Sequence, residues 1–167
     1  MMFAAWPDGS FDLDGALARC AIGRAGVIAA KNKREGDGCT PAGVWAMRRV
    51  LYRSDRGGKP VTDLPAFPIE PDDGWCDDVK NKLYNRPVKL PFPARCEHLW
   101  REDNVYDLII VLAFNDEPPR KGNGSAIFMH LARPDFGPTE GCVALSRAHM
   151  EKLLAKAQPG SALVVHK

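Results

Sequence analysis

The longest apolar stretch of the chain, Val105 to Phe114 (VYDLIIVLAF), contains β-branched residues and almost no polar positions. A strand with one face in water alternates apolar and polar residues, and this stretch does not. It therefore predicts a strand buried on both faces. Ser125 to Leu131 (SAIFMHL) has the same character and follows the turn RKGNG, so it predicts a second buried strand.

Shorter patterns extend this picture. Ala25 to Lys31 and Gly43 to Arg53 are expected to be strands, the second partly alternating, and Ser161 to His166 is expected to be a final strand. Ser146 is a suitable N-cap for a helix that runs through RAHMEKLLAKA and stops at QPG. These patterns predict a mainly β fold with one or two short helices. The length of 167 residues suits one domain covering residues 1–167.

The centre of the chain differs from these segments in composition. Arg56 to Arg95 is rich in Pro, Asp and Gly and has few long apolar runs. Such a segment predicts long ordered loops, which in a compact domain tend to line a functional site.

Composition narrows the class of protein. Hydrophobic residues make up 45% and charged residues 26%, with a formal net charge of +2. This balance argues against nucleic acid as a partner. No apolar run approaches the roughly 18 residues that span a membrane, and the N-terminus does not resemble a signal peptide. A cytoplasmic location, a lost export signal and an unusual start all remain open from the residues alone.

The five cysteines are expected neither to bind a metal nor to pair completely. They show no CxxC pair and no zinc spacing, so we expect no metal site. An odd number leaves at least one thiol free in a monomer even under oxidising conditions. They are Cys20, Cys39, Cys76, Cys96 and Cys142.

His130 and Cys142 are the strongest candidates for chemistry. Cys142 follows His130 by 12 residues, and Gly141 permits a positive φ or the close approach of a substrate. If the two segments are adjacent in the sheet, an imidazole could meet a thiol and favour the thiolate, whose pKa is otherwise roughly 8.5. A turn before the cysteine could also aim main-chain N–H groups at an oxyanion. The competing interpretation is a buried core cysteine beside a hydrogen-bonded structural histidine.

Several segments together resemble the L,D-transpeptidase (YkuD-like) catalytic domain. They are FMHLARPDFGPTEGCVAL, EGDGCTPAGVW, GWCDD, YNRPVKLP, LWREDNVYDLIIVLAFND and GSAIFMH, and they cover nearly the whole chain from Cys20 onward. The resemblance implies a β-sandwich and a cofactor-free enzyme acting on peptidoglycan stem peptides in the periplasm or at the cell wall. The enzyme would cleave an L-to-D peptide bond and pass the acyl group to an amine of a second stem, forming a cross-link. We expect a monomer.

The resemblance also assigns roles. Cys142 is the implied nucleophile and His130 its base. Gly141 and Cys142 would supply N–H groups to the oxyanion, and Thr139 would shape that turn. Glu140 stands where the family usually has a histidine. It could orient a donor amine, pair with Arg133, or face solvent.

Other side chains have two interpretations each. Trp75 could form an aromatic wall for the peptide stem or lie at the edge of the core. Tyr84 and Asn115 could contact the substrate backbone or hold loops. Arg133 could receive a substrate carboxylate or be an exposed structural arginine. Up to two disulfides could form among the four cysteines other than Cys142, with the pairing open.

Two further functions remain open. The same Cys/His pair could serve an L,D-carboxypeptidase or amidase that uses water as acceptor. The chain could instead be a non-catalytic domain that binds the cell wall.

Overall fold

The computed structural model describes residues 1–167 and contains thirteen strands, two short 3-10 helices and one α-helix. Strand accounts for 37% of the chain and helix for 10%, so the predicted mainly β fold with one or two short helices is confirmed. In chain order the elements are β1 (Met2–Ala5), β2 (Ser10–Leu13), β3 (Ala16–Ala21), β4 (Val27–Ala29), η1 (Ala30–Asn32), β5 (Thr40–Tyr52), η2 (Ser54–Arg56), β6 (Ala66–Pro68), β7 (Asp73–Cys76), β8 (Pro87–Lys89), β9 (Cys96–His98), β10 (Leu108–Leu112), β11 (Phe128–Leu131), β12 (Val143–Leu145), α1 (Arg147–Lys156) and β13 (Ala162–Val165).

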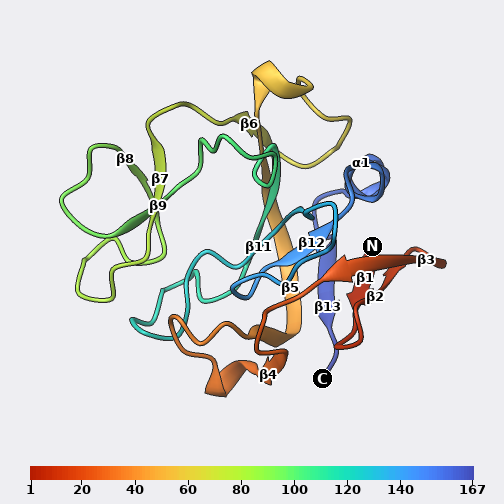
Figure 1. Ribbon diagram of the computed structural model, residues 1–167, viewed down its shortest axis with the longest axis horizontal. Coiled ribbons are helices and arrows are strands. Elements are labelled where there is room, and N and C mark those ends of the chain that lie inside the picture. Colours follow the sequence, from red (N-terminus) through yellow and green to blue (C-terminus); the bar gives the residue numbers. More distant parts are fainter.

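The large sheet folds back on itself around the long strand β5. Its strand order is β10-β11-β12-β3-β2-β1-β13-β5-β4, and β10 also pairs with β5. Since β5 pairs with β13 through its first half and with β10 through its second, it belongs to both layers of a sandwich. Figure 1 shows β5 running the height of the molecule, with β11 and β12 beside it and β1, β2 and β3 on one side.

Two cores explain why β10 and β11 are so apolar. Their inward side chains, among them Ile110 and Met129, join the main core between the layers. Their outward side chains, among them Ile109 and Phe128, join a second, smaller core with Trp75. Both faces are covered, as the uninterrupted apolar pattern predicts.

The second core is covered by a lobe that the central segment builds. There β7 pairs with β8 and with β9 to form a separate three-stranded sheet (Figure 1). The prediction of loops throughout 56–95 is therefore wrong in part, because short strands of three and four residues interrupt the loops. Strands so short, rich in Pro and Gly, do not produce a periodic pattern that sequence reading could detect.

The predicted elements outside the lobe are mostly found. Ser146 caps α1, its Oγ accepting the N–H of His149 across 3.3 Å. The strand expected over 25–31 is shorter, because β4 ends at Ala29 and a 3-10 turn begins at Ala30. None of the helices has the length and apolar character needed to cross a membrane.

The two ends of the chain meet in the sheet. Met2 to Ala5 pair in parallel with Ala162 to Val165, and β13 in turn pairs with β5. The N-terminal strands β1 to β3, which the sequence pattern does not predict, link this edge to β12 through β3.

Candidate active site

His130 lies on β11 and Cys142 directly precedes the neighbouring strand β12, as the hypothesis of a catalytic pair requires. β11 pairs in parallel with β12, with His130 opposite Ala144, and Cys142 directly precedes β12. Two residues along a strand return a side chain to the same face, so His130 and Cys142 face the same side as diagonal neighbours. Both are buried, and both line one cavity of about 540 Å³.

The imidazole of His130 is held in one orientation and one tautomer. Its Nδ1 lies 3.0 Å from the main-chain oxygen of Leu131. Since a carbonyl oxygen can only accept, Nδ1 carries the proton and Nε2 is left as the basic nitrogen. The ring also packs edge-on against Tyr106 at 5.4 Å between centroids. Burial lowers the pKa of His130 to about 4, so the imidazole is neutral at physiological pH.

The thiol of Cys142 is held by main-chain groups. Its Sγ donates to the carbonyl of Ala126 across 3.2 Å and accepts the N–H of Phe128 at 3.4 Å. Burial raises the pKa of Cys142 to about 12. The expectation that the imidazole favours the thiolate is therefore wrong for this state, in which both groups are neutral.

The turn before Cys142 is built around the hydroxyl of Thr139. Its Oγ1 donates to the carbonyl of Cys142 at 2.7 Å and accepts the N–H of Gly141 at 3.1 Å. Gly141 has a φ of +135°, and a Cβ there would lie 2.7 Å from the carbonyl oxygen of Cys39. The expected role of Thr139 in shaping the turn agrees with these bonds. The expectation that Gly141 offers its N–H to an oxyanion is wrong here, because Thr139 occupies that N–H, whereas the N–H of Cys142 has no partner within the protein.

Asn85 fixes the main chain at Ala126, whose carbonyl accepts the hydrogen bond from Cys142. It is buried with a φ of +56°, and its Oδ1 accepts the N–H of Ala126 at 3.0 Å and the Nε1–H of Trp75 at 2.8 Å. Its Nδ2 donates to the carbonyls of Phe114 and Asn115. A single amide thus joins the lobe to the segment that carries Ala126 and leads into β11.

Trp75 does not line the cavity. It is buried, and its ring packs edge-on against Phe128 at 5.0 Å. The prediction of an aromatic wall for the peptide stem is therefore wrong, and the alternative of a tryptophan at the edge of the core is correct. The reason is the Asn85 amide, which satisfies the indole N–H inside the protein.

Tyr84 and Asn115 make hydrogen bonds that hold loops in place. Of their two interpretations, loop support therefore applies and substrate contact does not. The hydroxyl of Tyr84 donates to Glu35 and accepts the N–H of Gly124. Asn115 bonds to main-chain groups of Arg120 and Gly124. Neither side chain lines the cavity.

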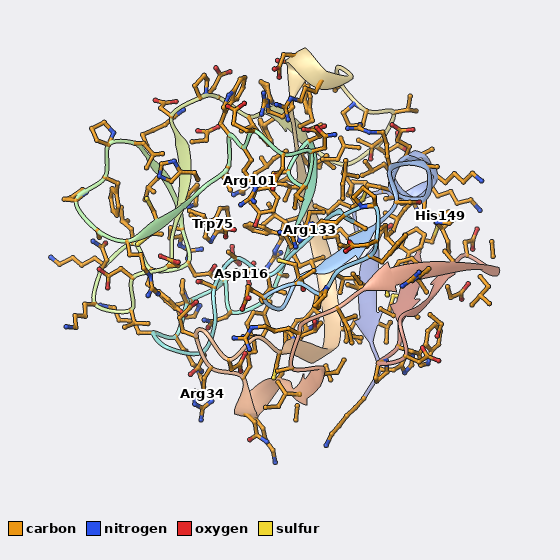
Figure 2. The ribbon with its side chains drawn as sticks, viewed as in Figure 1. Arg34, Trp75, Arg101, Asp116, Arg133 and His149 are labelled. Carbon is orange, nitrogen blue, oxygen red and sulfur yellow. The ribbon has the colours of Figure 1, made fainter.

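The two charged candidates near the turn are not paired with each other. Glu140 is exposed and forms an ion pair with Arg24 at 3.0 Å. Arg133 is exposed, lines the cavity, and has no carboxylate within ion-pair distance in the protein. Figure 2 shows Arg133 and Arg101 in the central region between the lobe and the large sheet, far from His149 beside α1.

The acidic wall of the cavity was predicted from the sequence only in part, since Asp77 alone was a candidate for binding a cationic side chain of a stem peptide, with a solvated loop as the alternative. Glu35, Asp77 and Glu97 line it together with Tyr106 and Ser125. Tyr106 donates to Glu97, and burial raises the pKa of Glu97. These residues come from loops and a three-residue strand, where an isolated carboxylate produces no recognisable pattern. No three side chains of His, Cys, Asp or Glu converge in a way that could hold a metal ion.

Comparisons with known proteins give the family to which the sequence belongs. A family model described as the L,D-transpeptidase catalytic domain (YkuD) matches residues 3–165. Among solved structures, an L,D-transpeptidase from Mycobacterium smegmatis aligns with 99% of this chain at 13% identity and a TM-score of 0.46. The alignment covers 58% of that protein, so this chain spans little more than half its length. None of the curated proteins compared with the chain matches it.

Proposed function

Because the chain belongs to the L,D-transpeptidase catalytic-domain family, we propose that it is a cysteine-dependent L,D-transpeptidase of peptidoglycan. It cleaves an L-to-D peptide bond in one stem peptide and transfers the acyl group to an amine of a second stem. The observation that carries the proposal is that Cys142 and His130, both buried and brought together by the pairing of β11 with β12, open into the same cavity.

In the acylation step, Sγ of Cys142 attacks the carbonyl carbon of the scissile peptide bond. The thiol proton passes to Nε2 of His130, whose Nδ1–H remains bonded to Leu131. The oxyanion that forms is stabilised by the unpartnered N–H of Cys142. The tetrahedral intermediate then collapses to a thioester as the imidazolium returns the proton to the departing amine.

In the second step, an acceptor amine attacks the thioester carbon. His130 takes one proton from that amine and delivers it to the departing sulfur, which restores the resting thiol. The cavity is mixed in charge, because Lys33, Arg95 and Arg101 line it as well and Asp77 forms an ion pair with Arg95 at 3.0 Å. Glu35 and Glu97 are the carboxylates that suit a positively charged amino group as it enters, before it loses its extra proton to solvent and attacks as the neutral amine. Arg133, which has no carboxylate partner, suits the substrate carboxylate.

Transfer and hydrolysis differ only in the acceptor, so the products identify the activity. Purified muropeptides are incubated with the protein and the products are weighed by mass spectrometry. Cross-linked dimers support the proposal, whereas trimmed monomers alone would establish an L,D-carboxypeptidase with water as acceptor. A chain that changes no muropeptide yet sediments with sacculi would be a wall-binding domain.

The nucleophile is identified by intact mass after exposure to a carbapenem, whose strained lactam carbonyl is attacked by the Cys142 thiol as His130 takes its proton. We expect one adduct on the wild type and none on Cys142→Ala. Cys39→Ala is the matched control, because Cys39 is equally buried but its Sγ bonds to the carbonyls of Ala25 and Asp37 and not to Ala126. An adduct on Cys142→Ala would refute the assignment.

The substrate determines where the protein must work. We propose that it acts as a monomeric single domain in the periplasm or at the cell wall. Fractionation of cells that produce the tagged chain tests the location, and light scattering of the purified protein tests the oligomeric state. Recovery in the cytoplasm alone, or a stable dimer, would contradict this part of the proposal.

A further inference from the structure

Two cysteines outside the active site face each other across the lobe. In the antiparallel pair β7–β9, Cys76 is the direct register partner of Cys96. Side chains of directly opposite residues lie on the same face of the sheet as nearest neighbours. Of the five cysteines, these two alone are register partners.

The hydrogen-bond pattern shows which kind of register pair this is. The N–H and carbonyl of Cys76 both bond on the β8 side, to Arg86 at 2.9 Å and Asn85 at 2.8 Å. The next residue, Asp77, donates its N–H to Arg95 at 3.3 Å. Cys76 and Cys96 therefore form a non-hydrogen-bonded pair, for which the Cα atoms are typically about 4.5 Å apart. That separation lies at the short end of the roughly 4.4–6.8 Å range that a disulfide spans.

The remaining thiols are directed elsewhere. Sγ of Cys20 bonds to the carbonyl of Ser10, that of Cys39 to Ala25, and that of Cys142 to Ala126. They therefore offer no competing partner for Cys76 or Cys96.

We propose that Cys76 and Cys96 are a disulfide site that ties β7 to β9 when the protein meets a disulfide oxidant. Cys96 is half-buried and lines a surface cleft of about 690 Å³, whereas Cys76 is fully buried. Cys96 is thus the thiol that an oxidant reaches first.

The chemistry is two thiol–disulfide exchanges. The Cys96 thiolate attacks the oxidant disulfide, forming a mixed disulfide and releasing one thiol. The Cys76 thiolate then attacks the sulfur of Cys96, closing the internal disulfide and releasing the second thiol. The two cysteines are oxidised by two electrons, the oxidant is reduced by two electrons, and their two protons leave on the released thiols.

Residues next to Cys76 and Cys96 in the sequence connect the disulfide site to the active site. Asp77, Arg95 and Glu97 flank the two cysteines and line the catalytic cavity. On the opposite face of β7, Trp75 packs against Phe128 and bonds to Asn85, which in turn holds Ala126. Closing the segment between Cys76 and Cys96 would therefore stiffen the acidic wall of the cavity, and it should raise the melting temperature by roughly 5–10 °C.

The test uses the full chain with Cys142→Ala, which removes the nucleophile and leaves four cysteines. The protein is incubated with oxidised glutathione, quenched in acid, and alkylated in denaturant with N-ethylmaleimide. Intact mass should show two alkylated thiols in place of four and no retained glutathione. Digestion without reductant should give one cross-linked peptide that contains Cys76 and Cys96.

Two variants in the same background complete the test. Cys96→Ala should abolish the internal disulfide, and Cys20→Ala should retain it, with circular dichroism confirming that both are folded. The proposal is overturned if all four thiols are alkylated after oxidation, or if the cross-link involves any other pair. Because the readout is a covalent bond, its outcome is independent of transpeptidase activity.

Discussion

The Sγ of Cys142 donates a hydrogen bond to the main-chain carbonyl of Ala126 across 3.2 Å and makes no hydrogen bond to the imidazole of His130. The resting site therefore holds a protonated thiol beside a neutral imidazole. Proton transfer to His130 has to accompany the attack on substrate rather than precede it.

The first prediction concerns the reactivity of that thiol. Burial raises the pKa of Cys142 to about 12, well above its ordinary value. At pH 7.5 the thiolate is then much scarcer than for an ordinary cysteine. We expect iodoacetamide to alkylate Cys142 at least about 100-fold more slowly than glutathione, as followed by mass spectrometry. Alkylation as fast as that of glutathione would instead indicate a preformed thiolate–imidazolium pair.

The second prediction concerns the dependence of stability on pH. In the unfolded chain His130 takes a proton near pH 6.5, but in the folded chain only near pH 4. Between these values the unfolded state binds more protons, so stability falls as pH falls through this window. The loss attributable to His130 should be about 2–3 kcal/mol between pH 8 and pH 4.5. Urea unfolding of wild type and His130→Gln measures it, because the variant should lack that part of the pH dependence.

The third prediction concerns Gly141. In Gly141→Ala a Cβ would lie 2.7 Å from the Cys39 carbonyl oxygen, at a φ of +135°. Strain and collision together should destabilise the protein by about 2–4 kcal/mol and abolish thioester formation. Gly160→Ala is the matched control, because its φ is +92° and nothing lies within 4 Å of the added carbon. Equal destabilisation of the two variants would show that the close approach to Cys39 is unimportant.

The fourth prediction concerns the hydroxyl of Thr139. Thr139→Val keeps the shape of the side chain but leaves the N–H of Gly141 and the carbonyl of Cys142 without their partner. The turn should shift, and the rate of acylation by a carbapenem should fall by about 10–100-fold. Thr62→Val removes a comparable bond to the N–H of Leu64 and should leave the rate unchanged. A wild-type rate in Thr139→Val would mean that the turn is held by other contacts.

The fifth prediction concerns Glu140, which lines the cavity and precedes Gly141. Its ion pair with Arg24 is exposed on both sides, with side-chain exposures of 77% and 52%. Glu140→Gln should therefore change the free energy of unfolding by less than about 1 kcal/mol. We expect Glu140→Gln to change the KM for the acceptor stem instead. A variant with an unchanged KM for both stems would place Glu140 outside the substrate site.

The central strands of the large sheet were predictable because they have a physical signature, whereas β1 to β3, β6 and β12 were not. Val105 to Phe114 and Ser125 to Leu131 are apolar on both faces, and the structure covers both faces. The lobe was not predictable, because its strands derive their stability from Trp75 and the Asn85 amide rather than from a periodic pattern. The same reason applies to Glu97, whose place in the cavity depends on the register of β7 and β9.

The sequence identified His130 and Cys142 as the candidate pair, but it did not predict their protonation states. The sequence predicts a meeting of His130 and Cys142 only if their two segments are adjacent in the sheet, and the parallel pairing of β11 with β12 meets that condition. The hydrogen bond from the thiol of Cys142 to the carbonyl of Ala126 depends on the φ of +51° at Ala126, and no sequence pattern indicates that conformation. In the resting site the thiol proton of Cys142 therefore points to the carbonyl oxygen of Ala126, as the main-chain conformation of Ala126 requires.

The pairing of Met2–Ala5 with Ala162–Val165 has a consequence for synthesis. The N-terminal strand leaves the ribosome long before its partner exists, and β13 is needed to join β1 to β5. The large sheet therefore closes only once β13 has been made, and this pairing of segments so far apart in sequence slows folding. Until then the edges of β1 and β5 that β13 covers remain unpaired.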